Sequence, residues 1–229
     1  MTGIRSPQPP PATPGPTRPR SAGRRSKPMD SDARWEEIIE AASAIFLKNG
    51  YEATSLQDIA SAVGILKGSI YYYIKAKEDL LFEIVDRAQV QFLATLEEDA
   101  ATEGASAPTR LSAFIHRWMT LNQKQREWNT VAERSFDRLT GERLQLVIER
   151  RDHFSAFVKR ILVQGVAEGA FDPGVDVSLA TITVFELLNH TNEWHQPEGR
   201  LSREGVADWY SQFIVRGLGG PHWDPRKDD

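Results

Sequence analysis

Two short amphipathic segments on either side of Gly64 constrain the fold of this chain more than any other feature. In the first segment, Leu56, Ile59, Ala60 and Val63 recur at helical spacing and define one apolar face. Gly64 follows directly and can adopt the left-handed backbone conformation that ends a helix. The pattern predicts a short helix and a tight glycine turn, after which a second helix starts.

The second segment carries more polar and aromatic side chains than a helix of its length can bury. Around Gly68 and Ile70 it places Lys67, Ser69 and the three consecutive tyrosines 71–73. Some of these side chains must face outward. Outward-facing tyrosines and lysines on the second helix suit contact with phosphates and base edges in a major groove of DNA. We therefore predict a helix-turn-helix.

The run 51–81 resembles the DNA-binding domain of TetR-family transcriptional regulators. The resemblance is carried by Thr54, Ile59-Ala60, Val63-Gly64, Gly68-Ser69-Ile70-Tyr71 and Lys77-Glu78-Asp79-Leu80. Leu66, Tyr73 and Ile74 depart from the family pattern, and Leu66 leaves the second helix without a side-chain cap. The resemblance implies an all-α fold, with an N-terminal three-helix helix-turn-helix domain and a C-terminal helical ligand-binding and dimerisation domain.

Composition and pattern divide the chain into four parts. Residues 1–28 hold eight of the thirteen prolines and six basic residues without an acid, so we expect a disordered basic tail. The tail is either simply solvated or adds phosphate and minor-groove contacts. We assign 29–90 to the DNA-binding domain, with the helix-turn-helix at 55–74, then 91–220 to the ligand-binding and dimerisation domain and 221–229 to a second tail.

The charge distribution is compatible with DNA binding despite an acidic total. The net charge is -4, and because residues 1–28 carry +6, the remaining 201 residues carry -10. The segment 66–77 nevertheless contains Lys67, Lys75 and Lys77 and no acid. Charges farther away than about 8–10 Å are screened, so this local field is the one that phosphates meet. The pattern favours a specific operator binder over a general DNA-coating protein.

The rest of the chain shows helical periodicity without an alternating strand pattern. Beyond the helix-turn-helix, we expect helices over about 31–49, 76–101, 110–125, 127–139, 142–168, 176–194 and 202–218. The domain boundary is placed near Gln89, so that the helix at 76–101 is a strut shared by both domains. An effector bound within 105–218 would tilt this strut.

The segment 176–194 is apolar on nearly every face. One chain of this size rarely covers the whole circumference of a helix, so a second copy is expected to cover part of it. A central helix in a monomer is the alternative. The resemblance assigns a four-helix homodimer interface to 142–168 and 176–194, and a two-fold dimer also suits a palindromic operator.

Residues suited to catalysis or metal binding do not form a recognisable motif. The chain has no cysteine, and His116, His153, His190 and His195 lack the spacing of a zinc helix. No nucleophile elbow or phosphate-binding glycine loop occurs. We expect no enzyme activity, no cofactor and no metal. Without a long apolar run or a secretory signal, we expect a cytoplasmic protein with no membrane association.

A small-molecule pocket is expected in the second half, where aromatic residues gather. Such residues are either core or pocket wall. Arginines on neighbouring helices are either solvated or together hold an anionic ligand. The predicted ligand-binding residues are Phe114, Trp118, Trp128, Phe136, Arg134, Arg138, Arg150, Arg151, Phe154 and Trp194.

The run 192–202, which contains Trp194 and His195, resembles a signature in regulators of fatty-acid and sterol breakdown. That branch of the family implies an acyl-CoA thioester as effector. An efflux-gene repressor that senses hydrophobic cationic drugs is an alternative, and it would favour Glu133 and Glu186 over the arginines. A helical acyl- or lipid-binding protein or enzyme without a DNA role is the alternative from another class.

Contact with operator DNA is expected from the helix-turn-helix and its flanks. The predicted DNA-binding residues are Thr54, Ser55, Lys67, Gly68, Ser69, Tyr71, Tyr72 and Lys77. Among these, Thr54 and Ser55 are expected to cap the first helix, and Lys77 to meet phosphate at the start of the strut.

Overall fold

The computed structural model describes residues 28–97, 104–196 and 198–219. Over these ranges the chain is helical: α1 (Pro28–Asn49), α2 (Leu56–Ala62), α3 (Lys67–Ile70), α4 (Lys77–Glu97), α5 (Ala107–Lys124), α6 (Arg126–Ser135), the 3-10 helix η2 (Phe136–Arg138), α7 (Gly141–Ala167), α8 (Val177–Trp194) and α9 (Arg203–Leu218). The all-α prediction is confirmed. Our predictions for the tails and for residues 98–101 concern positions outside the described ranges.

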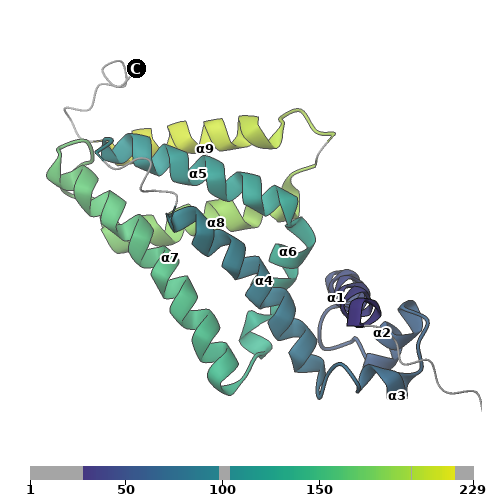
Figure 1. Cartoon of the computed structure of the whole chain (residues 1–229). Helices are drawn as coiled ribbons and strands as arrows, with labels where there is room; N and C mark the ends of the chain where they lie inside the picture. Colours follow the sequence, from purple (N-terminus) through teal and green to yellow (C-terminus); the bar gives the residue numbers. More distant parts are fainter. Residues whose placement is uncertain (1–27, 98–103, 197, 220–229) are drawn as a thin grey trace, which may run out of the picture.

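Figure 1 shows α1, α2 and α3 gathered at one end of the molecule, with α4 running from them into the second half. There α5 and α9 lie side by side, α8 packs against α5 and α7, and α7 also contacts α4. None of the described helices is long and apolar enough to cross a membrane. The arrangement makes α4 the element common to both halves.

Two helices around the helix-turn-helix end just before a glycine, as predicted. Gly50 follows α1 with φ +84° and Gly64 follows α2 with φ +69°, both in the left-handed region. The Ile65 N–H then donates to the Ala60 carbonyl at 2.9 Å, which closes the turn before α3. Gly50 thus lets the chain turn between α1 and α2, and Gly64 lets it turn between α2 and α3.

Two separate apolar clusters form the core, and they divide along α4. One includes α4 residues up to Val85 and the other begins at Phe92. The first cluster is not built by α1–α4 alone, because Val131, Leu139 and Val147 from α6, the following loop and α7 are buried within it. The DNA-binding half predicted at 29–90 therefore shares its core with the second half.

Two details differ from the predicted helices. The helix expected over 127–139 ends at Ser135, and the chain tightens into η2 before Leu139, which is 1% exposed. In α8, Val184 and Leu188 are buried, while Leu179 and Ile182 are 61% and 58% exposed. Because α8 is apolar on nearly every face, some of its apolar side chains lie on the surface of a single chain.

Candidate nucleic-acid interface and ligand pocket

Ser55 caps α2 and fixes the entry to the helix-turn-helix. Its side-chain oxygen accepts from the Asp58 N–H at 3.2 Å, and the Asp58 carboxylate accepts from the Ser55 N–H at 2.8 Å. The hydrogen bonds from the Ser55 hydroxyl and N–H lower the pKa of Asp58 below its ordinary value. Ser55 itself is exposed at the surface, and in the free protein its hydroxyl and its N–H both donate to the Asp58 carboxylate.

The second helix, α3, and the two tyrosines that follow it present polar and phenolic side chains outward. Lys67 and Ser69 are exposed, Tyr71 is 52% exposed and Tyr72 is 81% exposed. An added Cβ at Gly68 would meet nothing within 4 Å, so open space also lies above this position. The four side chains supply exposed cationic, hydroxyl and phenolic groups, and Gly68 lies among them.

Buried residues anchor α3 from beneath. Ile70 and Ile74 are 0% and 4% exposed and join the core of the DNA-binding half. Tyr73 turns inward, unlike the two tyrosines before it, and stacks on Trp35 of α1 with ring centroids 6.5 Å apart. Because the apolar side chains hold α3 against α1 and α2, its exposed surface is held in a fixed position.

Thr54 and Lys77 have different roles from those predicted. Thr54 is 2% exposed and its hydroxyl donates to the Gly50 carbonyl at 2.8 Å, so it neither caps α2 nor faces solvent. The Lys77 ammonium donates to the carbonyls of Tyr51 at 2.6 Å, Glu52 at 3.3 Å and Thr54 at 2.9 Å. Three carbonyls match the three donors of an ammonium, so Lys77 ties the α1–α2 loop to α4 instead of offering a charge to phosphate.

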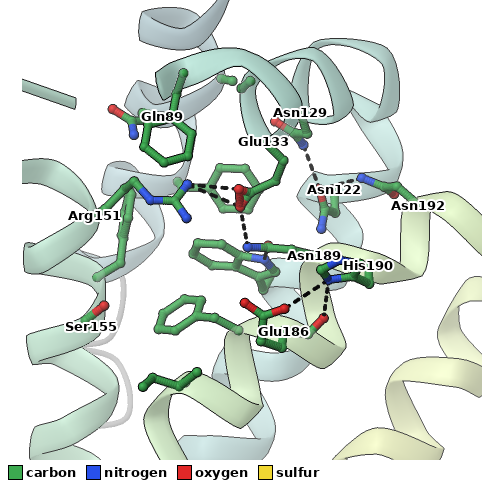
Figure 2. Close-up of a pocket in the computed structure, with 18 of the residues that line it drawn as sticks. Gln89, Asn122, Asn129, Glu133, Arg151, Ser155, Glu186, Asn189, His190 and Asn192 are labelled. Carbon is green, nitrogen blue, oxygen red and sulfur yellow. Dashed lines mark hydrogen bonds and ion pairs between the residues drawn. The ribbon is translucent and has the colours of Figure 1, made fainter. Parts of the chain in front are cut away.

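A cavity of about 550 Å³ lies among α4, α5, α6, α7 and α8. Its aromatic wall includes Phe92, Trp118, Phe154 and Phe185, and the centroid of the Trp118 ring lies 4.1–5.4 Å from the other three. Figure 2 shows polar side chains from α4, α6, α7 and α8 around the same space. Its size and mixed lining are those of a site for a small molecule.

Half of the predicted ligand-binding residues line this cavity, namely Trp118, Phe136, Phe154, Arg134 and Arg151. The other five do not. Phe114 packs behind the wall against Trp118 and Phe185, while Trp194 is 53% exposed at the end of α8. Trp128 lies under Arg87 beside the DNA-binding core, Arg138 pairs with Glu52 at 3.6 Å, and Arg150 pairs with Asp86 at 2.7 Å.

Both arginines that reach the cavity are paired with glutamates. Arg151 donates to the Glu133 carboxylate at 2.9 Å and Arg134 contacts Glu193 at 3.1 Å. The acids come from α6 and α8, and only folding brings them to arginines on α7 and α6. The alternative in which the arginines together hold an anionic ligand therefore meets facing carboxylates that already pair with both of them.

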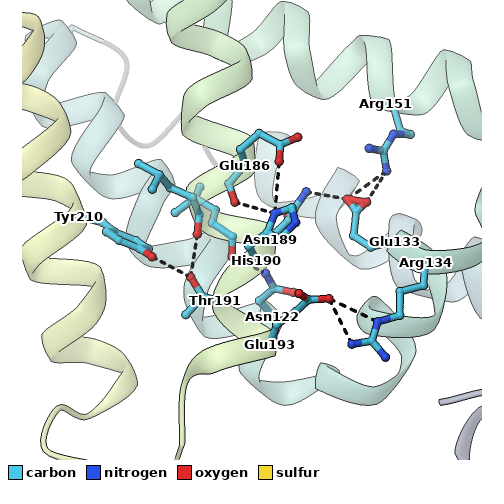
Figure 3. A network of polar contacts seen from close by, with 12 residues as sticks. Asn122, Glu133, Arg134, Arg151, Glu186, Asn189, His190, Thr191, Glu193 and Tyr210 are labelled. Atoms are coloured by element: carbon cyan, nitrogen blue, oxygen red, sulfur yellow. Dashed lines mark hydrogen bonds and ion pairs between the residues drawn. The ribbon is translucent and has the colours of Figure 1, made fainter. Parts of the chain in front are cut away.

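Asn189 links the aromatic wall to the Glu133–Arg151 pair. Its side-chain oxygen accepts from the Trp118 indole N–H at 3.0 Å, and its side-chain nitrogen donates to Glu133 at 2.7 Å. Figures 2 and 3 show this chain of contacts crossing from α8 to α6 and α7. Removing any member leaves a partly buried polar group without its partner.

Sequence reasoning missed a second polar group at the cavity, formed by three asparagines. The Asn122 side-chain oxygen accepts from Asn129 and from Asn192, each at 2.9 Å. The Asn122 nitrogen donates to the Leu188 carbonyl at 3.2 Å. All three asparagines are at most 7% exposed and line the cavity. The available signal was the presence of Asn192 in the largely apolar segment 176–194.

Glu186 and His190 lie at the exposed side of the cavity. The His190 Nδ1 atom is 3.3 Å from the Glu186 carboxylate, and both side chains are more than 60% exposed. Within the described part of the chain, no three His, Cys, Asp or Glu side chains are grouped so that they could hold a metal ion. Glu133 and Glu186, named for the cationic-drug alternative, both line the cavity.

Comparison with known proteins assigns both halves of the chain. Residues 38–84 match the family described as bacterial regulatory proteins, tetR family, and residues 104–218 match the tetracyclin repressor-like C-terminal domain. The first match covers α2 and α3, and the second covers α5 to α9, of which α5–α8 surround the cavity together with α4. The match to the C-terminal domain alone spans half of the 229 residues.

Several full-length proteins are similar across both halves. The transcriptional repressor KstR2 of Rhodococcus jostii is 27% identical over 194 residues, which cover 82% of this chain and 93% of that protein. The fatty acid metabolism regulator protein of Bacillus subtilis is 26% identical over 186 residues, covering 81% and 95%. AibR, solved in complex with isovaleryl coenzyme A and operator DNA, is 26% identical with a TM-score of 0.70, covering 80% and 98%.

Proposed function

The chain belongs to the TetR family of DNA-binding transcriptional regulators, and we propose that it is a repressor released from its operator by an acyl-CoA thioester. The acyl chain and thioester occupy the cavity among α4–α8, and the coenzyme phosphates remain at its open side. Operator contact is made by Ser55, Lys67, Ser69, Tyr71 and Tyr72, with Gly68 allowing close approach of the backbone.

The observation that carries this proposal is the double role of α6. Asn129 and Glu133 of α6 line the cavity, whereas Val131 of the same helix is 2% exposed in the core shared with α1–α4. An occupant that displaces α6 therefore changes the packing beneath α2 and α3. Because packed cores have discrete arrangements, a small shift at the cavity is converted into a change in the helix-turn-helix.

Polar contacts between α7 and α4 provide a second connection. The Thr140 N–H and hydroxyl donate to Glu78 at 2.9 and 3.1 Å, and Arg150 pairs with Asp86 at 2.7 Å. The Thr140 contacts hold the start of α7 against the end of α4 that adjoins the helix-turn-helix, and the Arg150–Asp86 pair joins the two helices farther along. To reverse operator occupancy from 99:1 to 1:99, the effector must prefer the released state by about 5.5 kcal/mol.

An acyl thioester is favoured over a free acid by the charge balance of the cavity. Because Arg151 and Arg134 already pair with glutamates, a buried carboxylate would have to break a pair, whereas a neutral thioester requires no such exchange. The similar proteins named for fatty-acid metabolism and solved with isovaleryl coenzyme A support the same ligand class.

Members of this family act as homodimers on operator DNA, and we place the interface on α8 and α9. Trp209 and Phe213 of α9 are each 54% exposed and stack with centroids 4.9 Å apart, and Leu179 of α8 is also exposed. Our sequence prediction paired 142–168 with 176–194 and omitted α9. Exposed aromatic pairs of this kind are suited to burial against a second copy.

Trp209→Glu should give a monomer in sedimentation analysis.

A hydrophobic cation is the second candidate effector, because Glu186 is an exposed carboxylate at the open side of the cavity. Glu133 is less suited to this role because Arg151 already occupies its carboxylate.

The effector is tested by thermal-shift measurements on the purified full-length protein. Acyl-CoA thioesters of several chain lengths are compared with the matching free acids, coenzyme A alone and a lipophilic cation such as tetraphenylphosphonium. We expect the thioesters to raise the melting temperature most. Stabilisation by the cation but not by any thioester would favour the second candidate.

We also propose that the protein acts on the chromosome in the cytoplasm and has no catalytic activity. The alternative of an acyl- or lipid-binding protein or enzyme without a DNA role is separated from this by duplex binding at low salt. A protein without a DNA role would not bind, whereas the surface of α3 should hold a duplex with strong salt dependence.

A further inference from the structure

Leu66 is an exposed apolar side chain within an otherwise polar surface. It is 80% exposed, which is the largest exposed fraction among the described Leu, Ile, Val and Phe side chains. Lys67 and Ser69 beside it are exposed, and so are Tyr71 and Tyr72. A single apolar side chain among cationic and hydroxyl groups is too small a patch for a protein partner, which needs hundreds of Å² of contact.

The position of Leu66 makes an apolar residue costly there. It is the residue that precedes the first turn of α3, with φ -71° and ψ 145°, and makes no side-chain hydrogen bond to that turn. Serine, aspartate or asparagine at such a position would accept a backbone N–H and stabilise the helix. Neither capping nor core packing therefore accounts for a leucine at this site.

We infer that Leu66 reads a thymine in the operator by packing against its 5-methyl group in the major groove. This rests on the proposed operator contact through α3. The first residues of a recognition helix are those that reach base edges, and the thymine methyl is the one apolar group that a base pair presents in the major groove. Lys67 and the exposed hydroxyls supply the phosphate contacts that position the side chain.

The expected size of the effect follows from the burial of one methyl group. Removing a methyl from an apolar contact weakens binding by roughly fourfold for each half-site. A dimer on a palindrome carries two such contacts, so the reduction in affinity on changing both is roughly fifteenfold.

The test uses a duplex that the wild-type protein selects from a random library. Each thymine is replaced by deoxyuridine, which keeps base pairing and removes only the methyl group, and affinities are measured by fluorescence anisotropy. We expect one thymine in each half-site to be sensitive for wild type and for Leu66→Met, which keeps an apolar side chain. The same replacement should have no effect on Leu66→Ala.

Circular dichroism of both variants checks that the fold is kept, as expected for a side chain that is 80% exposed. If wild type selects no specific duplex, the proposed operator binding itself is wrong. If it selects one but shows no sensitive thymine, or if Leu66→Ala keeps the full sensitivity, operator binding stands and the role of Leu66 is wrong.

Discussion

The Arg143 Nη2 atom of α7 lies 2.5 Å from the Asp79 Oδ1 atom of α4. The other Asp79 oxygen accepts from the N–H groups of Lys75 and Ala76 at 2.6 and 2.9 Å, in the loop that leaves the helix-turn-helix. One carboxylate thus joins three elements: the loop after α3, the start of α4 and the start of α7. It is a direct polar connection between the cavity half and the DNA-binding half.

The ionised Asp79 carboxylate should make the stability of the fold depend on pH. Burial opposes ionisation of Asp79, but the Ala76 N–H and the Arg143 guanidinium outweigh it, so the pKa of Asp79 lies below its ordinary value. A lowered carboxyl pKa gives stability that is complete above about pH 4 and is lost as the pH falls through the folded-state pKa. Asp79→Ala should lower the free energy of unfolding at pH 7 by about 1–2 kcal/mol.

Urea unfolding of wild type and Asp79→Ala at pH 7 and at pH 3 measures this difference. We expect the difference in the free energy of unfolding between the two proteins to be smaller at pH 3 than at pH 7. An equal difference at both values would contradict the role of the ionised carboxylate. Arg200→Ala, which changes an exposed arginine in the loop before α9, serves as the control for loss of surface charge.

Lys67 and Lys77 should separate a DNA contact from a structural one. Lys67→Ala should leave stability unchanged and reduce the salt dependence of operator affinity, by about 0.9 in log–log slope for each phosphate that is no longer neutralised. Lys77→Ala should instead destabilise the fold by about 1–3 kcal/mol, because three carbonyls lose their donor. Urea unfolding and anisotropy at several salt concentrations measure both quantities. The opposite pattern would restore Lys77 as a phosphate contact.

Gly68 should tolerate a methyl group in the free protein but not on DNA. No atom lies within 4 Å of an added Cβ, and alanine favours a helix over glycine by about 0.5–1 kcal/mol, so Gly68→Ala should be at least as stable as wild type. If the α3 backbone approaches DNA here, operator affinity should fall at least tenfold. Gly217→Ala, which also has open space, is the matched control for stability only, because α9 belongs to the proposed dimer interface. Unchanged affinity in Gly68→Ala would remove this residue from the interface.

Glu133 should determine whether the cavity rejects free acids. Glu133→Gln removes the carboxylate that pairs with Arg151 and leaves the guanidinium to a ligand. Because a charge-assisted hydrogen bond contributes about 1.5–3 kcal/mol, we expect affinity for a fatty acid to rise roughly tenfold or more, with a smaller change for the thioester. Isothermal titration with both ligands measures the ratio. An unchanged ratio would show that this ion pair does not set ligand choice.

The fold and part of each site were predictable because they depend on local patterns. The left-handed glycines at positions 50 and 64, the missing side-chain cap at Leu66 and the outward direction of Tyr72 all follow from periodicity and conformational preference. The contacts of Thr54 and Lys77 were not predictable, because both side chains bond to backbone carbonyls of the α1–α2 loop, whose fold the sequence pattern does not show.

The cavity was harder to predict for the same reason. The aromatic residues marked its neighbourhood, but the sequence pattern does not show which arginines face it or which acids face them. Glu133 and Arg151 are 18 residues apart and meet only because α6 and α7 are joined through η2. Likewise, Asn122 and Asn192 are 70 residues apart. Contacts between distant helices decide the chemistry of this site.

Release of operator by ligand is the most direct measurement. The wild-type protein is bound to a labelled duplex that it selected from a random library, and acyl-CoA thioesters, free acids and coenzyme A are titrated into the complex while anisotropy is followed. We predict that a thioester dissociates the duplex at concentrations where the matching acid and coenzyme A do not. A specific complex that no thioester dissociates would contradict the proposed effector.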